Sequence, residues 1–283
     1  MPPTNVPTLR QRRLGAELRK LRERAGLSST AAAARLGVQQ ARMSMIEAGR
    51  YAVSADRVRA MAISYSCTDP ALIDSLANMT GGRTRGWWDE YRELLPAALI
   101  DLAELEHHAK EVRVVLAIHL PGLLQTADHI RALFQEGLPE LRPHEIEHRL
   151  SYRIRRQEVL HRKPSIPYTA IIHEAALRMQ VGGPATLRAQ LGHLLEMSEL
   201  DNITLRVIPF EGGSFSGNGQ PMDYVYGAVR QLDTVQLDVH HGCEFLDAES
   251  ELTKYRSVID RMQSNALTPE TSRDFIHNIA RSL

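Results

Sequence analysis

The sequence predicts two domains of different classes: an N-terminal all-α bundle of five helices that contains a helix-turn-helix, and a C-terminal mixed α/β domain. Short apolar stripes at helical spacing, separated by glycines, run through residues 10–78. Segments typical of strands and of helices alternate over residues 87–283. Charge divides at the same place: residues 1–86 carry 14 Arg and Lys against 6 Asp and Glu, whereas residues 87–283 carry 20 against 28. The neutral total charge therefore hides a basic part and an acidic part.

The domain boundaries follow from composition, and a length of 283 residues is comfortable for two domains. Early prolines indicate a flexible arm over residues 1–9, before the helical domain at 10–78. The glycine-rich polar stretch TGGRTRG indicates a linker over residues 79–86. The α/β domain, expected to carry regulation and oligomerisation, then fills residues 87–283.

Residues 26–51, GLSSTAAAARLGVQQARMSMIEAGRY, have the layout of two short helices joined by a tight turn. Ser28 is a suitable N-cap for an alanine-rich helix over residues 30–36, because its hydroxyl can accept a hydrogen bond from a free backbone N–H. Gly37 then permits a left-handed turn that would strain other residues. A second helix is expected over residues 39–48. This layout is that of a DNA-binding helix-turn-helix.

The outer face of the second helix suits base reading. Its outward residues are expected to contact bases in the major groove, and they are Gln39, Gln40, Ala41, Arg42 and Met45. Gln can pair with adenine, Arg with guanine, and Ala or Met can touch the methyl group of thymine. Four further residues are expected to bind DNA phosphates: Arg19, Arg22, Ser29 and Arg50. The alternative is an ordinary helical hairpin whose polar residues are simply solvated.

Three segments, LRKLRERAGLS, ARLGV and MSMIEAG, resemble the Cro/repressor helix-turn-helix family, also called the XRE family, over residues 10–77. The resemblance implies binding to a double-stranded DNA operator. The family often has Gln at the start of the first motif helix and Leu three residues later, where this chain has Ser29 and Ala32. Ser29 is expected not to brace Gln40 as a glutamine would. A single small motif binds weakly, so a homodimer reading two half-sites is expected.

Two kinds of segment alternate in the C-terminal part. Apolar, β-branched runs predict strands over residues 112–120, 168–172, 203–209, 222–226 and 234–239. Helical stripes predict helices over residues 126–135, 143–160 and 185–199, and two further helices close the chain, the second capped by Thr268. The closing stripes are either core or a dimer seam. Gln236 and Asp238 alternate with apolar residues, which indicates that the last strand has one wet face.

Several blocks follow one another after residue 86: WWDEYRELLP, PGLLQT, RIRRQEVLHRK, IIHEAALRMQVGG and NITLRVIPF. Their kind and order resemble the C-terminal domain of actinobacterial WhiJ-like XRE regulators, also described as antitoxin-like transcriptional regulators. The resemblance implies a small partner protein encoded nearby. Arg149, Arg153 and Arg156 belong to a basic run on the helix predicted over residues 143–160. This run is either a solvated face or a surface that binds an acidic partner.

The sequence therefore favours a DNA-binding transcriptional regulator whose C-terminal domain receives a signal. The signal comes either from the small partner protein or from a small-molecule effector in an apolar pocket. The alternative is an antitoxin-like interaction protein that neutralises a small partner and regulates its own promoter.

No catalytic residue, cofactor or metal site is expected. His240, His241, Cys243 and Glu244 lie close together, but metal ligands usually include a residue from a second segment, so a structural or surface role is expected. No apolar run is long enough to span a bilayer, and the N-terminus lacks the apolar core of a secretory signal. With only two cysteines, a cytoplasmic, nucleoid-associated protein is expected.

Overall fold

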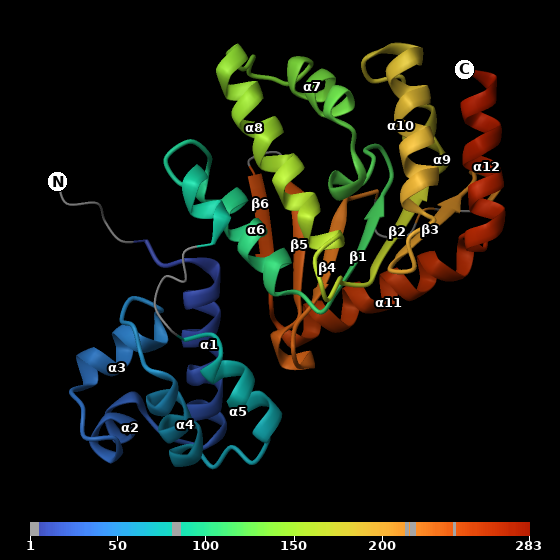
Figure 1. Ribbon diagram of the computed structural model, residues 1–283. Coiled ribbons are helices and arrows are strands. Elements are labelled where there is room, and N and C mark those ends of the chain that lie inside the picture. Colours follow the sequence, from blue (N-terminus) through green and yellow to red (C-terminus); the bar gives the residue numbers. More distant parts are fainter. Residues whose placement is uncertain (1–5, 81–85, 213–214, 216–218, 240–241) are drawn as a thin grey trace. The chain divides into compact units, whose positions relative to one another are not determined.

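The computed structural model describes residues 6–80, 86–212, 215, 219–239 and 242–283 (Figure 1). The chain divides into two units, Met1–Asp89 and Glu90–Leu283. The arm predicted over residues 1–9 and the linker predicted over residues 79–86 lie partly outside the described residues.

Five helices make up the described part of the first unit, which confirms the predicted bundle. They are α1 (Leu9–Arg24), α2 (Ser29–Arg35), α3 (Gln40–Glu47), α4 (Ala55–Ser64) and α5 (Pro70–Ala77). Four of them begin at a side chain that accepts a hydrogen bond from the backbone N–H three residues on, namely Thr8, Ser28, Ser54 and Asp69. The cap at Thr8 places the start of α1 inside the arm that the prolines predicted.

The core of the first unit is apolar, and it brings α1 against α3. Leu18 and Met43 are fully buried. Gly15 allows the close approach of the two helices, because a Cβ atom at this position would lie 2.5 Å from the backbone oxygen of Glu47 and 2.7 Å from that of Ile46. A glycine is therefore needed here for packing, although it lowers helix propensity.

We expect Gly15→Ala to destabilise the first unit by about 1–3 kcal/mol. The added methyl group meets backbone oxygens, which cannot turn aside as a flexible side chain would. Denaturant unfolding measures the effect. Gly192→Ala is the matched control, because a Cβ atom at that helical position meets nothing within 4 Å, and it should be neutral or stabilising. Equal stabilities of Gly15→Ala and the unchanged protein would contradict this account of the packing.

A mixed sheet lies at the centre of the second unit, with the strand order β3-β2-β1-β4-β5-β6 in the described residues. The strands are β1 (Glu111–Leu116), β2 (Tyr168–His173), β3 (Ile203–Ile208), β4 (Met222–Tyr226), β5 (Thr234–Val239) and β6 (Gly242–Leu246). β1, β2 and β3 are parallel to one another, whereas β4, β5 and β6 continue the sheet with antiparallel pairing. The predicted mixed α/β class is confirmed.

Helices cover both faces of this sheet (Figure 1). They are α6 (Ala97–His108), α7 (Ala127–Gln135), α8 (Pro143–Arg156), α9 (Glu174–Arg178), α10 (Gly183–Met197), α11 (Glu249–Asn265) and α12 (Pro269–Ser282). Short 3₁₀ turns occur at Trp87–Tyr91, Gly122–Leu124, Gln157–Leu160, Phe210–Gly212 and Arg230–Leu232.

Two apolar cores lie on the two sides of the sheet. Ile276 of α12 packs with Leu191 of α10 and Val114 of β1 in one core. Ile259 of α11 packs with Tyr224 of β4 in the other. The stripes of the two closing helices are therefore core within this chain rather than a dimer seam.

The structure corrects three expectations about the second unit. The sequence did not predict β6. The helix predicted over residues 143–160 ends at Arg156 and continues only as a 3₁₀ turn. Gln236 was expected on a wet face but is 3% exposed. Helices α6 and α8 cover this face of the sheet, since their side chains line the same cavity as Gln236.

His129 of α7 is buried, and its Nδ1 atom has no hydrogen-bond partner among the described residues. Burial, with a smaller contribution from Arg153, lowers the pKa of the imidazole from 6.5 to about 4. Between these two pH values the unfolded chain binds a proton at this residue and the folded chain does not.

We therefore expect the second unit to lose stability as the pH falls from 6.5 to about 4, the interval set by the lowered pKa. His129→Gln should remove this part of the pH dependence. Denaturant unfolding at a series of pH values tests it, with His193→Gln as the control because His193 is more accessible. An identical pH dependence in His129→Gln and the unchanged protein would refute the assignment.

Candidate nucleic-acid interface

The predicted turns hold α2 and α3 in the arrangement of a helix-turn-helix. Gly37 and Gly49 have φ angles of +65° and +71°, in the left-handed region that glycine favours. The hydroxyl of Ser28 accepts a hydrogen bond from the N–H of Ala31. α2 and α3 pack against each other, and Met43 is buried on the inner side of α3. The opposite side of α3 is left at the surface.

The residues expected to read bases all lie on this outer side. All five are exposed: Gln39, Gln40, Ala41, Arg42 and Met45. The side chain of Gln39 makes no capping hydrogen bond, although this residue is the N-cap of α3. Four of the five lie at the start of α3, which is the end of the second motif helix that enters the major groove in this class of fold.

Tyr51, which the sequence analysis did not single out, positions Arg42. The guanidinium carbon of Arg42 lies 4.4 Å from the centroid of the Tyr51 ring, a distance typical of a cation–π contact. Tyr51 is 42% exposed, so the contact stands at the surface and orients the guanidinium there. An aromatic residue two positions after the glycine that ends α3 was the available signal.

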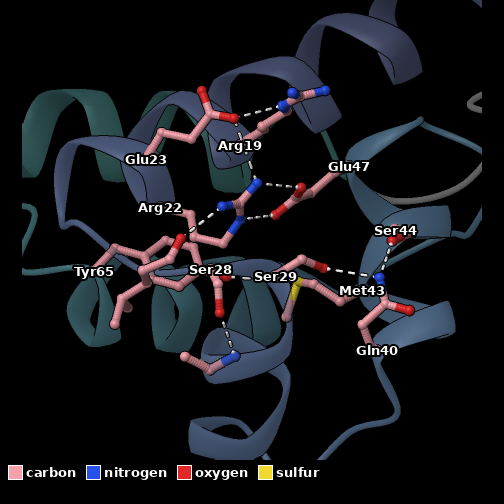
Figure 2. A network of polar contacts seen from close by, with 12 residues as sticks. Arg19, Arg22, Glu23, Ser28, Ser29, Gln40, Met43, Ser44, Glu47 and Tyr65 are labelled. Atoms are coloured by element: carbon pink, nitrogen blue, oxygen red, sulfur yellow. Dashed lines mark hydrogen bonds and ion pairs between the residues drawn. The ribbon is translucent and has the colours of Figure 1, made fainter.

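Two hydroxyl groups hold the side chain of Gln40 (Figure 2). Its Nε2 atom donates to Ser44 Oγ at 2.9 Å and to Ser29 Oγ at 3.3 Å. The expectation that Ser29 would not brace Gln40 is therefore wrong, because the turn brings the first residue of α2 close to the first residue of α3. Both amide hydrogens are used, so Oε1 is the group left to accept a hydrogen bond from a base.

Arg22 forms a buried ion pair and is not placed to bind phosphate, which corrects the sequence prediction. Its Nε and Nη2 atoms donate to the two carboxylate oxygens of Glu47 at 2.6 and 2.9 Å (Figure 2). Its Nη1 atom donates to the backbone oxygen of Leu27 at 2.7 Å. Each side chain of the pair is 8% exposed. The pair joins α1 to the end of α3, and Glu47 raises the pKa of Arg22.

The other phosphate candidates lie at the surface but differ in their partners. Arg19 is exposed, and its Nε atom donates to Glu23 at 2.7 Å. It would have to exchange this partner for a phosphate. Ser29 holds Gln40. Arg50 is exposed, and among the described residues its guanidinium has no hydrogen bond or ion pair. Arg50 is therefore the best placed of the four.

Many other arginines of the first unit serve the fold. Their guanidinium groups donate to backbone oxygens: Arg10 to Asn78, Arg12 to Pro7, Arg35 to Ser64 and Arg57 to Leu36. The net positive charge of this part therefore overstates the number of side chains that are free to meet DNA phosphates.

The arginines expected at a partner surface on α8 lie largely inside the second unit, which corrects that expectation. Arg156 is buried, and it donates to both carboxylate oxygens of Glu106 at 2.8 and 2.5 Å. Arg153 donates to Gln125 at 2.8 Å and lies 4.7 Å from the centroid of the Phe134 ring. Arg149 lies 5.8 Å from the same ring centroid. The side of α8 that carries Arg153 and Arg156 thus faces the protein interior.

The remaining candidates do not form a metal site in the part of the chain that the structure describes. His240 and His241 lie outside the described residues. Elsewhere in the described ranges, no group of three His, Cys, Asp or Glu side chains is arranged to hold a metal ion. Cys67 and Cys243 are free thiols. No helix among the described segments combines the length and the apolar character needed to cross a bilayer.

Comparison with known proteins agrees with the division seen in the structure. A family model described as a helix-turn-helix domain matches residues 13–76, from within α1 to the last turn of α5, and supports a DNA-binding regulator of the XRE kind. No curated protein and no solved structure matches the chain significantly. A second family model, described as a domain of unknown function (DUF5753), matches residues 99–278. Because this second match covers more than half of the chain, the protein belongs to the DUF5753 family and carries a helix-turn-helix domain before that region.

Proposed function

We propose that this protein is a sequence-specific transcriptional regulator that binds a double-stranded DNA operator through α3. The observation that carries the proposal is the exposed start of α3, where Gln40 is held by Ser29 and Ser44 and Arg42 is held by Tyr51. Side chains that are already fixed lose less conformational entropy when they bind a base edge. Their chemistry is that of base readers, because Arg42 can recognise guanine and the free Oε1 atom of Gln40 can accept a hydrogen bond from the amino group of a base.

The second unit completes the proposal as the regulatory and oligomerisation part. One small helix-turn-helix contacts few bases, whereas two copies in a homodimer read half-sites about 34 Å apart along the duplex. A signal received by the second unit, from a small partner protein or from a small molecule, changes the affinity of the dimer for its operator. The proposal assigns no catalytic step and no cofactor to the chain, which acts in the cytoplasm at the nucleoid.

A gel shift of the full chain on the DNA upstream of its own gene tests the proposal, with random DNA as competitor. The double variant Gln40→Ala/Arg42→Ala is the control. A specific shift that is lost in the variant supports operator binding through α3. Equal binding to random DNA, or a specific shift that survives in the variant, would overturn it. Binding confined to its own promoter across the genome would favour the antitoxin-like alternative.

We expect Arg42→Ala to weaken binding to the preferred operator by about 1–3 kcal/mol and to relax specificity at one base pair. Arg50→Ala should instead weaken binding to all sequences alike and reduce the slope of log affinity against log salt concentration by about 1. Fluorescence anisotropy on operator and random DNA at several salt concentrations separates the two effects. Equal losses on random DNA for both variants would contradict the base-reading role of Arg42.

A further inference from the structure

The second unit contains a cavity of about 320 Å³. Side chains of the strands β1, β2, β4, β5 and β6 line it, together with side chains of α6, α7 and α8 and of the segment 119–125. Small-molecule sites in proteins usually have volumes of about 300–1,000 Å³. The cavity is therefore large enough for a small organic ligand.

Part of the lining of this cavity is apolar. Leu99 and Leu102 of α6 line it together with Leu116, Leu123 and Leu133. A ligand that fills the cavity must therefore present an apolar surface of its own, because a polar group placed against these leucines would lose its hydrogen bonds to water.

Another part of the lining is polar, and most of its groups already have partners. Arg156 pairs with the buried Glu106, and Arg153 donates to Gln125. The side-chain amide of Gln236 donates to Asp238 at 2.7 Å. These groups are fixed before any ligand arrives.

The polar groups of Asp223 and Tyr168 differ from these in their hydrogen bonding. In the described ranges, no hydrogen bond joins either the Asp223 carboxyl or the Tyr168 hydroxyl to another residue, although both side chains line the cavity. Tyr168 is 1% exposed. In the sheet, Asp223 stands between Val114 of β1 and Gln236 of β5. Burial, with a contribution from Asp238, raises the pKa of Asp223 well above its usual value.

The carboxyl of Asp223 and the hydroxyl of Tyr168 are therefore available to accept hydrogen bonds inside the cavity. An ammonium group suits them, because it has three N–H donors and no acceptor. A carboxylate away from water is also less unfavourable when a cation accompanies it.

We propose that this cavity binds a small primary amine with an apolar body, whose ammonium group donates hydrogen bonds to Asp223 and Tyr168 and whose apolar part lies against the leucines of α6. The ammonium group gives Asp223 a cationic partner, and the apolar part displaces water from the leucines. Such an amine would be the small-molecule signal of the regulator, and this role rests on the proposed function.

Three probes of similar shape and different charge test the proposal: 2-phenylethylamine, 2-phenylethanol and 3-phenylpropionate. Binding to the full chain is measured at neutral pH by ligand-observed NMR and titration calorimetry, without DNA. We expect the amine to bind at least about tenfold more tightly than the alcohol, and the carboxylate to bind least. Equal or tighter binding of the alcohol or the carboxylate, or no binding of any probe, would overturn the proposal.

Variants assign the binding to this cavity. Asp223→Asn should reduce the affinity for the amine to that for the alcohol, whereas Asp201→Asn, which changes an exposed carboxylate, should leave it unchanged. Tyr168→Phe removes only the hydroxyl and should weaken amine binding several-fold, so the test does not depend on the folding of one variant. Amine binding that survives in folded Asp223→Asn would refute the site. The binding measurements contain no DNA and are independent of the gel shift. A failed gel shift together with intact amine binding would therefore count against the proposed function alone.

Discussion

Arg22→Ala is expected to destabilise the first unit by about 3–5 kcal/mol, because removing one partner of a buried ion pair leaves the other charge without compensation. The variant leaves the Glu47 carboxylate, which is 8% exposed, without its ion-pair partner, and it also removes the hydrogen bond to the Leu27 oxygen. Arg19→Ala is the matched control, because it removes the same charge from the same helix. The Arg19 side chain is 61% exposed, and its pair with Glu23 should contribute little to stability because solvent screens it.

Hydrogen exchange of the full chain, resolved along the sequence, measures this loss in the first unit separately from the second. The pair Arg22→Met/Glu47→Leu should recover part of the stability, since it leaves no charge buried without a partner. If Arg22 instead bound a DNA phosphate, as the sequence predicted, the opposite result would be expected. If Arg22→Ala kept its stability and instead flattened the salt dependence of DNA binding, the ion pair would not be its function.

Glu106→Ala is expected to have an effect of similar size, about 3–5 kcal/mol, in the second unit. Arg156, the last residue of α8, would lose the carboxylate that accepts two of its hydrogen bonds, and its side chain is only 7% exposed. Glu147→Ala is the control, because Glu147 pairs with Arg131 at the surface, where the two side chains are 56% and 38% exposed. Removing Glu147 should therefore change the stability little, because solvent screens this pair.

Denaturant unfolding followed by hydrogen exchange measures the loss in Glu106→Ala. Replacement of both partners, as Glu106→Leu/Arg156→Met, should be less harmful than Glu106→Ala alone, since no charge is then left unpaired. A Glu106→Ala protein as stable as Glu147→Ala would show that Arg156 finds another partner or reaches water.

The elements that the sequence predicted well depend on local chemistry. A serine that caps a helix acts on an N–H three residues away, as Ser28 does. Gly37 needs only its own backbone angle to make the turn. The cap at Thr268 is confirmed for the same reason. The five helices of the first unit and the strands β1 to β5 could therefore be placed by residue type and periodicity.

The errors concern partners that are distant in the sequence. Arg22 and Glu47 are 25 residues apart, and Arg156 and Glu106 are 50 apart. An arginine on an amphipathic helix has the same sequence signature whether it faces water or a buried carboxylate. Gln236 was placed on a wet face because the helices that cover this face, α6 and α8, are distant from β5 in the sequence.

The brace on Gln40 has a consequence for how the target sequence changes during evolution. In this protein both amide hydrogens of Gln40 are held by serines, one of them on α2. Replacing Ser29 by alanine frees one hydrogen, so that the amide can present the donor and acceptor together, as adenine requires. Two gene copies with identical recognition helices can therefore come to control different promoters through one codon that lies outside those helices.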